Sequence, residues 1–267
     1  PAQDNKKKDT PVTKPLLIQK LTRQESQRLG YGGTVTIVGA PEGSIAIQGW
    51  ERSEMAVTAE IELQAESDED LQRLATLNSF TFDQDINHVR LLTTGTHDKN
   101  FMRKAAKNFP KKLLGLPWKI NYRIRVPVAT DLEIDAGRGP ITISEVSGSI
   151  RLSAAESEAK LTLTGGVVTA TIAVGKVDLT IPVRSWRGSG VEIRLATGDL
   201  TVNLPAGFNG DIDAEILRTG NIENNFGTIE SREKPGITPR LIKARAGAGG
   251  AYFHFIVGDG KVVLKQK

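Results

Sequence analysis

The sequence has 267 residues, no cysteine and a formal net charge of +4, and 39% of its residues are hydrophobic but only 5% aromatic. A chain without cysteine can have no disulfide framework, no thiolate nucleophile and no cysteine-based zinc site. No apolar run approaches the about 20 residues that a membrane-spanning helix needs. The composition favours one large domain with a core of Ile, Val, Leu and Ala.

Residues 1–15 are polar, basic and contain proline, a pattern typical of a disordered tether. A tether at the start of a mature chain often follows a removed export signal. We therefore expect an exported protein that is periplasmic, associated with the outer membrane or on the cell surface.

Residues 16–125 are predicted to form N-terminal strands that continue into a repeat region. After an amphipathic piece over 16–29, apolar residues alternate around Val35, Ile45 and Val57, which predicts a small antiparallel meander. Ser67 can cap a helix near 68–78, since acidic residues follow it and apolar residues then share one face. Strands resume at Phe80 and at Val89, around a turn.

A basic insertion over 99–119 interrupts this pattern. Residues 99–125 contain nine Lys or Arg and no Asp or Glu, so the rest of the chain has 26 basic against 31 acidic residues. Asp98 can cap a short helix that Pro110 ends. The basicity of the chain is therefore local, which makes this segment the first candidate for a binding site.

Residues 126–230 are glycine-punctuated β repeats. Apolar residues fall on every second position, and Gly175, Gly198 and Gly220 each stand directly before a new strand, 23 and 22 residues apart. Strict alternation places one set of side chains on each face of a strand. Residues 231–267 are then predicted to form a loop and a capping hairpin that turns at 258–260.

The fold class that we predict is all-β, an elongated β-solenoid or β-helix-like stack of short strands with one or two short helices. Two strands in about 20 residues fall within the period of solenoid repeats. A β-sandwich of short strands is the alternative.

Three phrases resemble the bacterial β-strand-repeat family known as "putative adhesin": GRGPITISEVSGSIRLS, ATGDLTVNLPAGFNGDIDAEILRTGNIEN and VGDGKVVLKQK. The likeness covers roughly residues 32–264 and includes a Leu-Pro-Ala-Gly-Phe-like turn at 204–208. It implies an exported or envelope-associated protein with a β-helix-like or elongated β fold. It brings no enzymatic activity and no catalytic motif.

The residues themselves point to no catalytic site, no metal site and no cofactor. The histidines at 88, 97 and 254 lack the spacing of metal ligands. Carboxylates on outward positions of the repeats could form ladders for Ca²⁺ or for glycan cleavage. Because Arg151, Arg194 and Arg218 occupy positions of the same kind, a solvated face of mixed charge explains them better. These carboxylates are Asp131, Glu133, Asp135, Asp178, Glu192, Asp199, Asp211, Asp213 and Glu215.

The predicted binding residues lie in the basic segment, where cations alternate with aromatic and leucine side chains. This mixture suits an anionic membrane surface or an acidic polysaccharide, and no nucleic-acid-binding module is recognisable. The alternative is a lid whose apolar residues pack on the sheet while its lysines keep it soluble. The residues are Arg103, Lys104, Lys107, Lys111, Lys112, Trp118 and Lys119.

We therefore expect a non-enzymatic, exported structural or adhesive β-repeat protein of the bacterial cell envelope. One alternative is an anionic lipid- or polyanion-binding protein that uses residues 99–125. A second is a glycan-active enzyme on a carboxylate-bearing β face.

Overall fold

The computed structural model describes residues 15–105 and 108–267. Over these residues the chain is all-β, with two short helices and a single sheet of 17 strands, which confirms the predicted class. The tether predicted over 1–15 lies outside the described residues except for its last position.

The strands differ widely in length, from two residues to 18. They are β1 (Leu17–Arg28), β2 (Thr34–Val38), β3 (Ile45–Trp50), β4 (Glu54–Ala65), β5 (Ser79–Asp85), β6 (His88–Thr94), β7 (Trp118–Pro127), β8 (Asp131–Arg138), β9 (Ile141–Ser144), β10 (Ser149–Thr162), β11 (Gly165–Thr180), β12 (Arg187–Leu204), β13 (Gly210–Asn225), β14 (Glu230–Ser231), β15 (Ile237–Thr238), β16 (Leu241–Ala246) and β17 (Tyr252–Gln266). The helices are α1 (Asp68–Ala75) and α2 (Lys99–Ala105), with a 3-10 turn, η1, over Lys111–Leu113.

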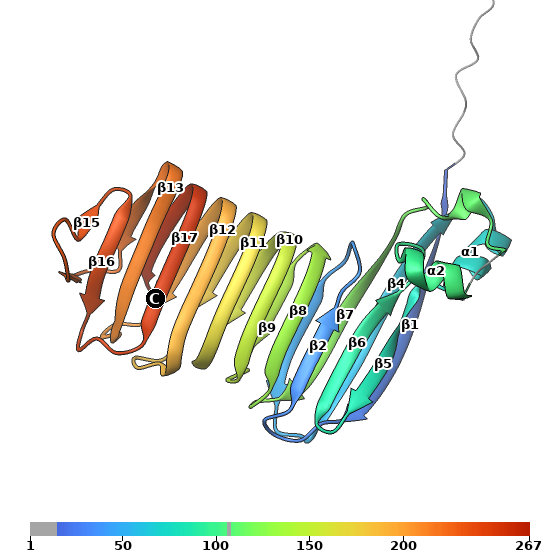
Figure 1. Cartoon of the computed structure of the whole chain (residues 1–267), viewed down its shortest axis with the longest axis horizontal. Coiled ribbons are helices and arrows are strands. Elements are labelled where there is room, and N and C mark those ends of the chain that lie inside the picture. The colour runs from blue at the N-terminus through green and yellow to red at the C-terminus, as the bar shows by residue number, and fades with distance from the viewer. Residues whose placement is uncertain (1–14, 106–107) are drawn as a thin grey trace, which may run out of the picture.

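Parallel pairing in register builds most of the sheet. Strands β2 and β3 pair with β8 and β9 on one side and with β6 and β7 on the other. The first half of β10 pairs with β8 and its second half with β9, and β11 and β12 each add one long strand. We call each such pair of short strands, or each long strand, a rung. The rungs follow one another along the long axis of the molecule (Figure 1).

Alternation along the rungs places one set of side chains in a shared core. In β10, Ile150 and Leu152 of the first half and Ala159 and Leu161 of the second are all buried and belong to one hydrophobic cluster. The residues that alternate with them, Arg151 and Lys160, are exposed. Aliphatic side chains fit this core because β-branched and other apolar residues pack well on a pleated surface.

Each rung changes direction at a corner where the backbones of neighbouring rungs come into close contact. Gly198 has a φ of +136°, and a Cβ atom there would lie 1.7 Å from the carbonyl oxygen of Gly175. Gly260 has a φ of +142° and would meet the oxygen of Gly198 at 1.8 Å. Only glycine avoids both the strained conformation and the overlap. The glycines that punctuate the sequence are therefore the corners of the rungs.

The predicted antiparallel meander over β2, β3 and β4 is wrong. Strands β2 and β3 do not form a hairpin, because Gly43, at a φ of +134°, makes the chain turn a corner between them. The parallel stack therefore includes β2 and β3 and begins well before residue 126. The N-terminal end is instead antiparallel, since β4 pairs with β7 and with β1, and β5 pairs with β6.

The predicted C-terminal hairpin is also wrong. Residues 252–266 form one strand, β17, which pairs in parallel with β12 on one side and with β13 on the other. The Gly-Asp-Gly sequence at 258–260 is a corner like that at Gly198, not a hairpin turn. The last strand thus lies between two rungs that follow each other in sequence (Figure 1).

The outer end of the stack is covered by a strand that the sequence did not reveal. Strand β16 pairs antiparallel with β13 and with the two-residue strands β14 and β15. Behind it, Arg218 on β13 donates from Nε to Asp259 Oδ2 on β17 at 2.9 Å and from Nη2 to the carbonyl of Ala196 on β12 at 3.1 Å. This side chain joins three rungs, and its hydrogen bond lowers the pKa of Asp259 to about 2.

Replacing Gly198 by Ala should destabilise the protein strongly. The substitution adds a Cβ atom 1.7 Å from a backbone oxygen, and the left-handed backbone alone costs about 1–3 kcal/mol. Thermal unfolding followed by circular dichroism measures the effect. Gly115→Ala is the control, since a Cβ there meets nothing within 4 Å. Equal unfolding midpoints for the two variants would show that the corner contact is not needed.

Candidate functional site

The basic segment forms a protrusion at the N-terminal end of the stack, between β6 and β7 (Figure 1). Asp98 caps α2 by accepting at Oδ1 from the backbone N–H groups of Phe101, at 3.1 Å, and Asn100, at 2.8 Å. These hydrogen bonds hold the pKa of Asp98 below its usual value. Leu113 of η1 is buried, so the protrusion is anchored on the core by an apolar side chain.

The predicted binding residues of this segment do not form one cluster of free charge. Arg103 and Lys104 on α2 and Lys111 on η1 are exposed, and Lys107 lies outside the described residues. Lys112 donates to Asp70 Oδ2 of α1 at 2.7 Å, which lowers the pKa of that carboxyl. The remaining two residues, Trp118 and Lys119, belong to β7.

Trp118 and Lys119 have structural partners as well. The Trp118 ring is partly buried and packs against the His97 ring, tilted by 40° with 5.3 Å between the ring centroids. Lys119 lies 3.3 Å from Glu62 of β4. Burial acts to raise the pKa of Glu62, but the hydrogen bond from Lys119 and its charge outweigh it, so that pKa is lowered. Lys112 and Lys119 thus attach the segment to α1 and β4.

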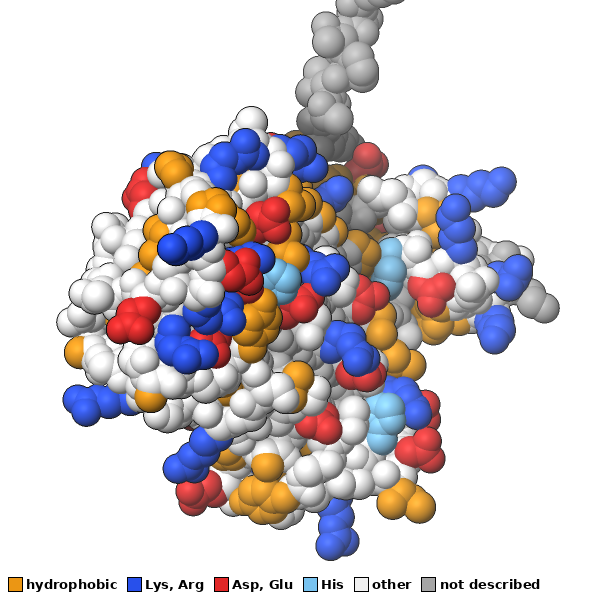
Figure 2. Space-filling view, turned by 60° about the vertical axis from the view of Figure 1, so that its left-hand side comes forward, with side chains coloured by type: hydrophobic (Ala, Val, Ile, Leu, Met, Phe, Trp, Pro, Cys, Tyr) orange, Lys and Arg blue, Asp and Glu red, His pale blue; other side chains and the backbone are white. Residues whose placement is uncertain are grey.

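Four of the nine outward carboxylates, Glu133, Glu192, Asp211 and Asp213, pair with arginine side chains. Glu133 pairs with Arg151 at 3.2 Å, Glu192 with Arg194 at 2.6 Å, and Asp211 with Arg245 at 2.9 Å. Figure 2 shows basic and acidic side chains interspersed over the face in view. Within residues 15–105 and 108–267, no group of three or more His, Asp or Glu residues could hold a metal ion.

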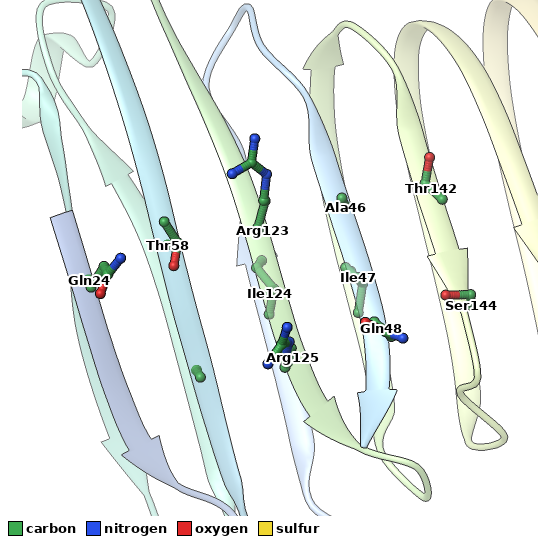
Figure 3. Close-up of a pocket in the computed structure, with 11 residues that line it drawn as sticks. Gln24, Ala46, Ile47, Gln48, Thr58, Arg123, Ile124, Arg125, Thr142 and Ser144 are labelled. Carbon is green, nitrogen blue, oxygen red and sulfur yellow. The ribbon is translucent and has the colours of Figure 1, made fainter. Parts of the chain in front are cut away.

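A groove of about 680 Å³ lies on the outer face of strands β1, β4, β7, β3 and β9 (Figure 3). Arg123 and Arg125 project into it from β7. In register, Arg123 has Thr58 on one side and Ala46 on the other, and Arg125 has Ala56 and Gln48. The two alanines are short, so they leave space beside the arginines. The rim is formed by Gln24 on β1 and by Thr142 and Ser144 on β9.

A second hollow, of about 490 Å³, continues this groove and shares Ala46 and Arg123 with it. It is lined by Lys119, Asn121 and Glu60. Asn121 is held in place because its Oδ1 accepts from the backbone N–H and the hydroxyl of Ser44, both at 3.0 Å. The extended groove therefore has polar side chains along its whole length, set among smaller apolar ones.

The two arginines of the groove differ in their surroundings. Arg123 pairs with Glu60 at 3.1 Å, and its side chain is still 73% exposed. For Arg125, no carboxylate of the described residues lies within 4 Å; its guanidinium carbon instead lies 5.6 Å from the centre of the Trp50 ring. The groove therefore offers one uncompensated guanidinium and one that is bound only at the surface, where ion pairs contribute little.

The sequence indicates Arg123 and Arg125 only as part of the basic segment and does not reveal the groove. Gln24, Thr58 and Thr142 come from three distant segments, and only the register of five strands brings them together. The one local signal was the spacing of the two arginines, which puts both on the outward face of β7.

Comparison with known proteins gives distant structural neighbours only. No family model and no curated protein matches the chain. A "putative cell adhesion protein" from Clostridium sporogenes ATCC 15579 is 15% identical, with a TM-score of 0.46, covering 92% of this chain and 100% of that one. A "putative adhesin" from Bacteroides fragilis NCTC 9343 is 13% identical, with a TM-score of 0.39, covering 92% and 97%.

A "putative lipid binding protein" from Parabacteroides distasonis ATCC 8503 is 10% identical, with a TM-score of 0.21, covering 93% of this chain and 96% of that one. The second of these neighbours bears the name of the family that the sequence resembles. At these identities and TM-scores, none of the three carries an argument about this chain. No helix of the described residues is long and apolar enough to cross a membrane.

Lys112 and its neighbour Lys111 should differ in their effect on stability. Lys112→Ala removes the ammonium that pairs with Asp70, whose residue is only 5% exposed, and a buried carboxylate that loses its partner destabilises a fold. Lys111→Ala removes an equal charge from an exposed side chain. We expect a lower urea midpoint for Lys112→Ala alone. Equal midpoints would mean that the ion pair does not hold the segment on α1.

Proposed function

We propose that the chain is a non-enzymatic, exported structural or adhesive β-repeat protein of the bacterial cell envelope. The observation that supports this best is the continuous register from β6 and β7 through to β13, which makes one long body with an open outer surface. Such a body presents extended faces to a partner, as stacked-repeat proteins do.

We also propose that this body is a β-solenoid with two strands in each rung rather than a β-sandwich. Sandwiches are built from antiparallel sheets. Here β10, β11, β12, β17 and β13 pair in parallel over nearly their whole lengths. Each strand therefore buries its inward side chains mainly against those of its neighbours in the stack.

The ion pairs on the outer faces support a structural role for the acidic residues over an acid–base role. A glycosidase needs two carboxyl groups held about 5–10 Å apart across a substrate, one of them protonated. Glu133, Glu192 and Asp211 are each bound to an arginine. Each of these carboxylates therefore already has a cationic partner on the protein's own surface.

Binding to isolated cell envelopes tests the proposal. We expect purified protein to co-sediment saturably with envelope fragments of a Gram-negative bacterium and to release no reducing ends from their polysaccharides. The control is protein unfolded by heat and cooled. Release of reducing ends would replace this function by the glycan-active alternative, and an absence of saturable binding would contradict an adhesive role.

Anionic lipid binding by the basic segment is the second candidate function. It is favoured by the exposure of Arg103, Lys104 and Lys111 beside Leu114, whose surface is 42% exposed. Each cation near an anionic surface contributes about 1 kcal/mol. The groove on β7 is not involved in this candidate.

Liposome co-sedimentation tests this candidate with matched variants. Replacement of Arg103, Lys104 and Lys111 by Ala should abolish binding to vesicles that contain phosphatidylserine. Replacement of Lys160, Lys176 and Lys265 by Ala removes the same charge from β10, β11 and β17 and should leave binding unchanged. Equal losses in both triple variants would indicate a response to net charge and reject a site on this segment.

A further inference from the structure

We propose that the groove over β7 binds a linear acidic glycan, with Arg123 and Arg125 holding its carboxylate groups. This inference rests on the proposed adhesive role and assigns it a site and a class of ligand. It concerns the outer face of β1, β4, β7, β3 and β9 and is independent of the basic protrusion.

The spacing of the two arginines suits a repeating anion. They stand two residues apart on β7, which places their Cα atoms about 6.6–6.8 Å apart on the same face. Each guanidinium presents a planar fork of donors that takes a carboxylate through two hydrogen bonds. The extended groove continues along β7 in the same direction, past Asn121 to Lys119, which lies six residues and therefore about 20 Å from Arg125. A short stretch of polymer fits this length.

The electrostatics of the groove leave these donors available. Arg125 has no carboxylate partner within 4 Å among the described residues, and its guanidinium carbon lies 5.6 Å from the centre of the Trp50 ring, which is a cation–π contact. This contact leaves the donor groups of the guanidinium available to an anion. Glu60, which pairs with Arg123, is itself 46% exposed in its side chain. An incoming carboxylate can therefore displace Glu60 or share the Arg123 guanidinium with it.

The rest of the lining favours a sugar over a bilayer. The amides of Gln24 and Gln48 and the hydroxyls of Thr58, Thr142 and Ser144 offer both donors and acceptors, as sugar hydroxyls require. Of the apolar residues of the lining, Ile47 and Ile124 are buried under the floor, and Ala46 and Ala56 are half-buried. None of the exposed large hydrophobic side chains of the described residues borders the groove. The groove therefore has no exposed apolar side chain to insert into a bilayer, whereas a hydrated polymer can form hydrogen bonds along its length.

Calorimetric titration with a galacturonate hexamer tests the inference directly. We expect the protein to bind the hexamer and not its fully methyl-esterified form, which has the same shape without charge. Arg123→Gln/Arg125→Gln should weaken binding by at least about tenfold, since charge-assisted hydrogen bonds are lost. Lys160→Gln/Lys176→Gln removes the same charge from β10 and β11 and should bind normally. Unchanged melting temperatures establish that the variants are folded.

A second variant separates shape from charge. Ala46→Leu fills the space beside Arg123 while keeping both arginines, and we expect it to weaken binding of the hexamer. The inference is overturned if the hexamer does not bind, if its methyl ester binds equally, or if the double arginine variant binds as well as the unsubstituted protein. Loss of liposome binding in that variant would instead point to a membrane. Envelope binding without hexamer binding would remove this ligand class and leave the adhesive role standing.

Discussion

The contact on which the structure depends is the close approach of backbones at the corners of the rungs. At Gly198 and Gly260 there is no room for a Cβ atom between one rung and the next. Because the corners are in contact, the rungs on both sides stay in register, and register keeps every apolar residue facing the core. A one-residue slip would turn the core outward. The same register sets the rows of side chains across the outer faces, including the row that holds Arg123.

Strand β17 occupies a place in the stack that does not follow the order of the chain. The strand follows β13 to β16 in the chain, yet it separates β12 from β13 and pairs with both. Contacts between residues so far apart in sequence form late and slowly. The distal rungs are therefore complete only when β17 is in place. Its aromatic side chains fit this role, since Phe253 packs against Trp186 and Phe208 from the two flanking segments.

Local patterns in the sequence predict the features that depend on neighbouring residues alone. Alternation identified the strands and their buried faces, and Ser67 identified the start of α1, where its hydroxyl accepts from the N–H of Asp70. Alternation does not reveal which strand is the partner. The spacing of Gly198 and Gly220 therefore predicts that their strands are neighbours in the stack. In the structure, the strand that contains Gly260 lies between them. The groove could not be predicted for the same reason, because its walls are neighbours only through long-range pairing.

The proposal that the chain holds a polymer rests on the long stack, the ion pairs on its faces and the groove over β7. The stack depends on the placement of β17, and because the chain has no cysteine, introduced cysteines test this placement directly. Thr201 is in register with Val263, and Val263 with Glu223. Cysteines on neighbouring strands, with Cα atoms about 4.8 Å apart, can form a disulfide. Cysteines two strands apart, with Cα atoms about 10 Å apart, cannot. Thr201→Cys/Val263→Cys should cross-link on oxidation and Thr201→Cys/Glu223→Cys should not; the opposite result would contradict the account.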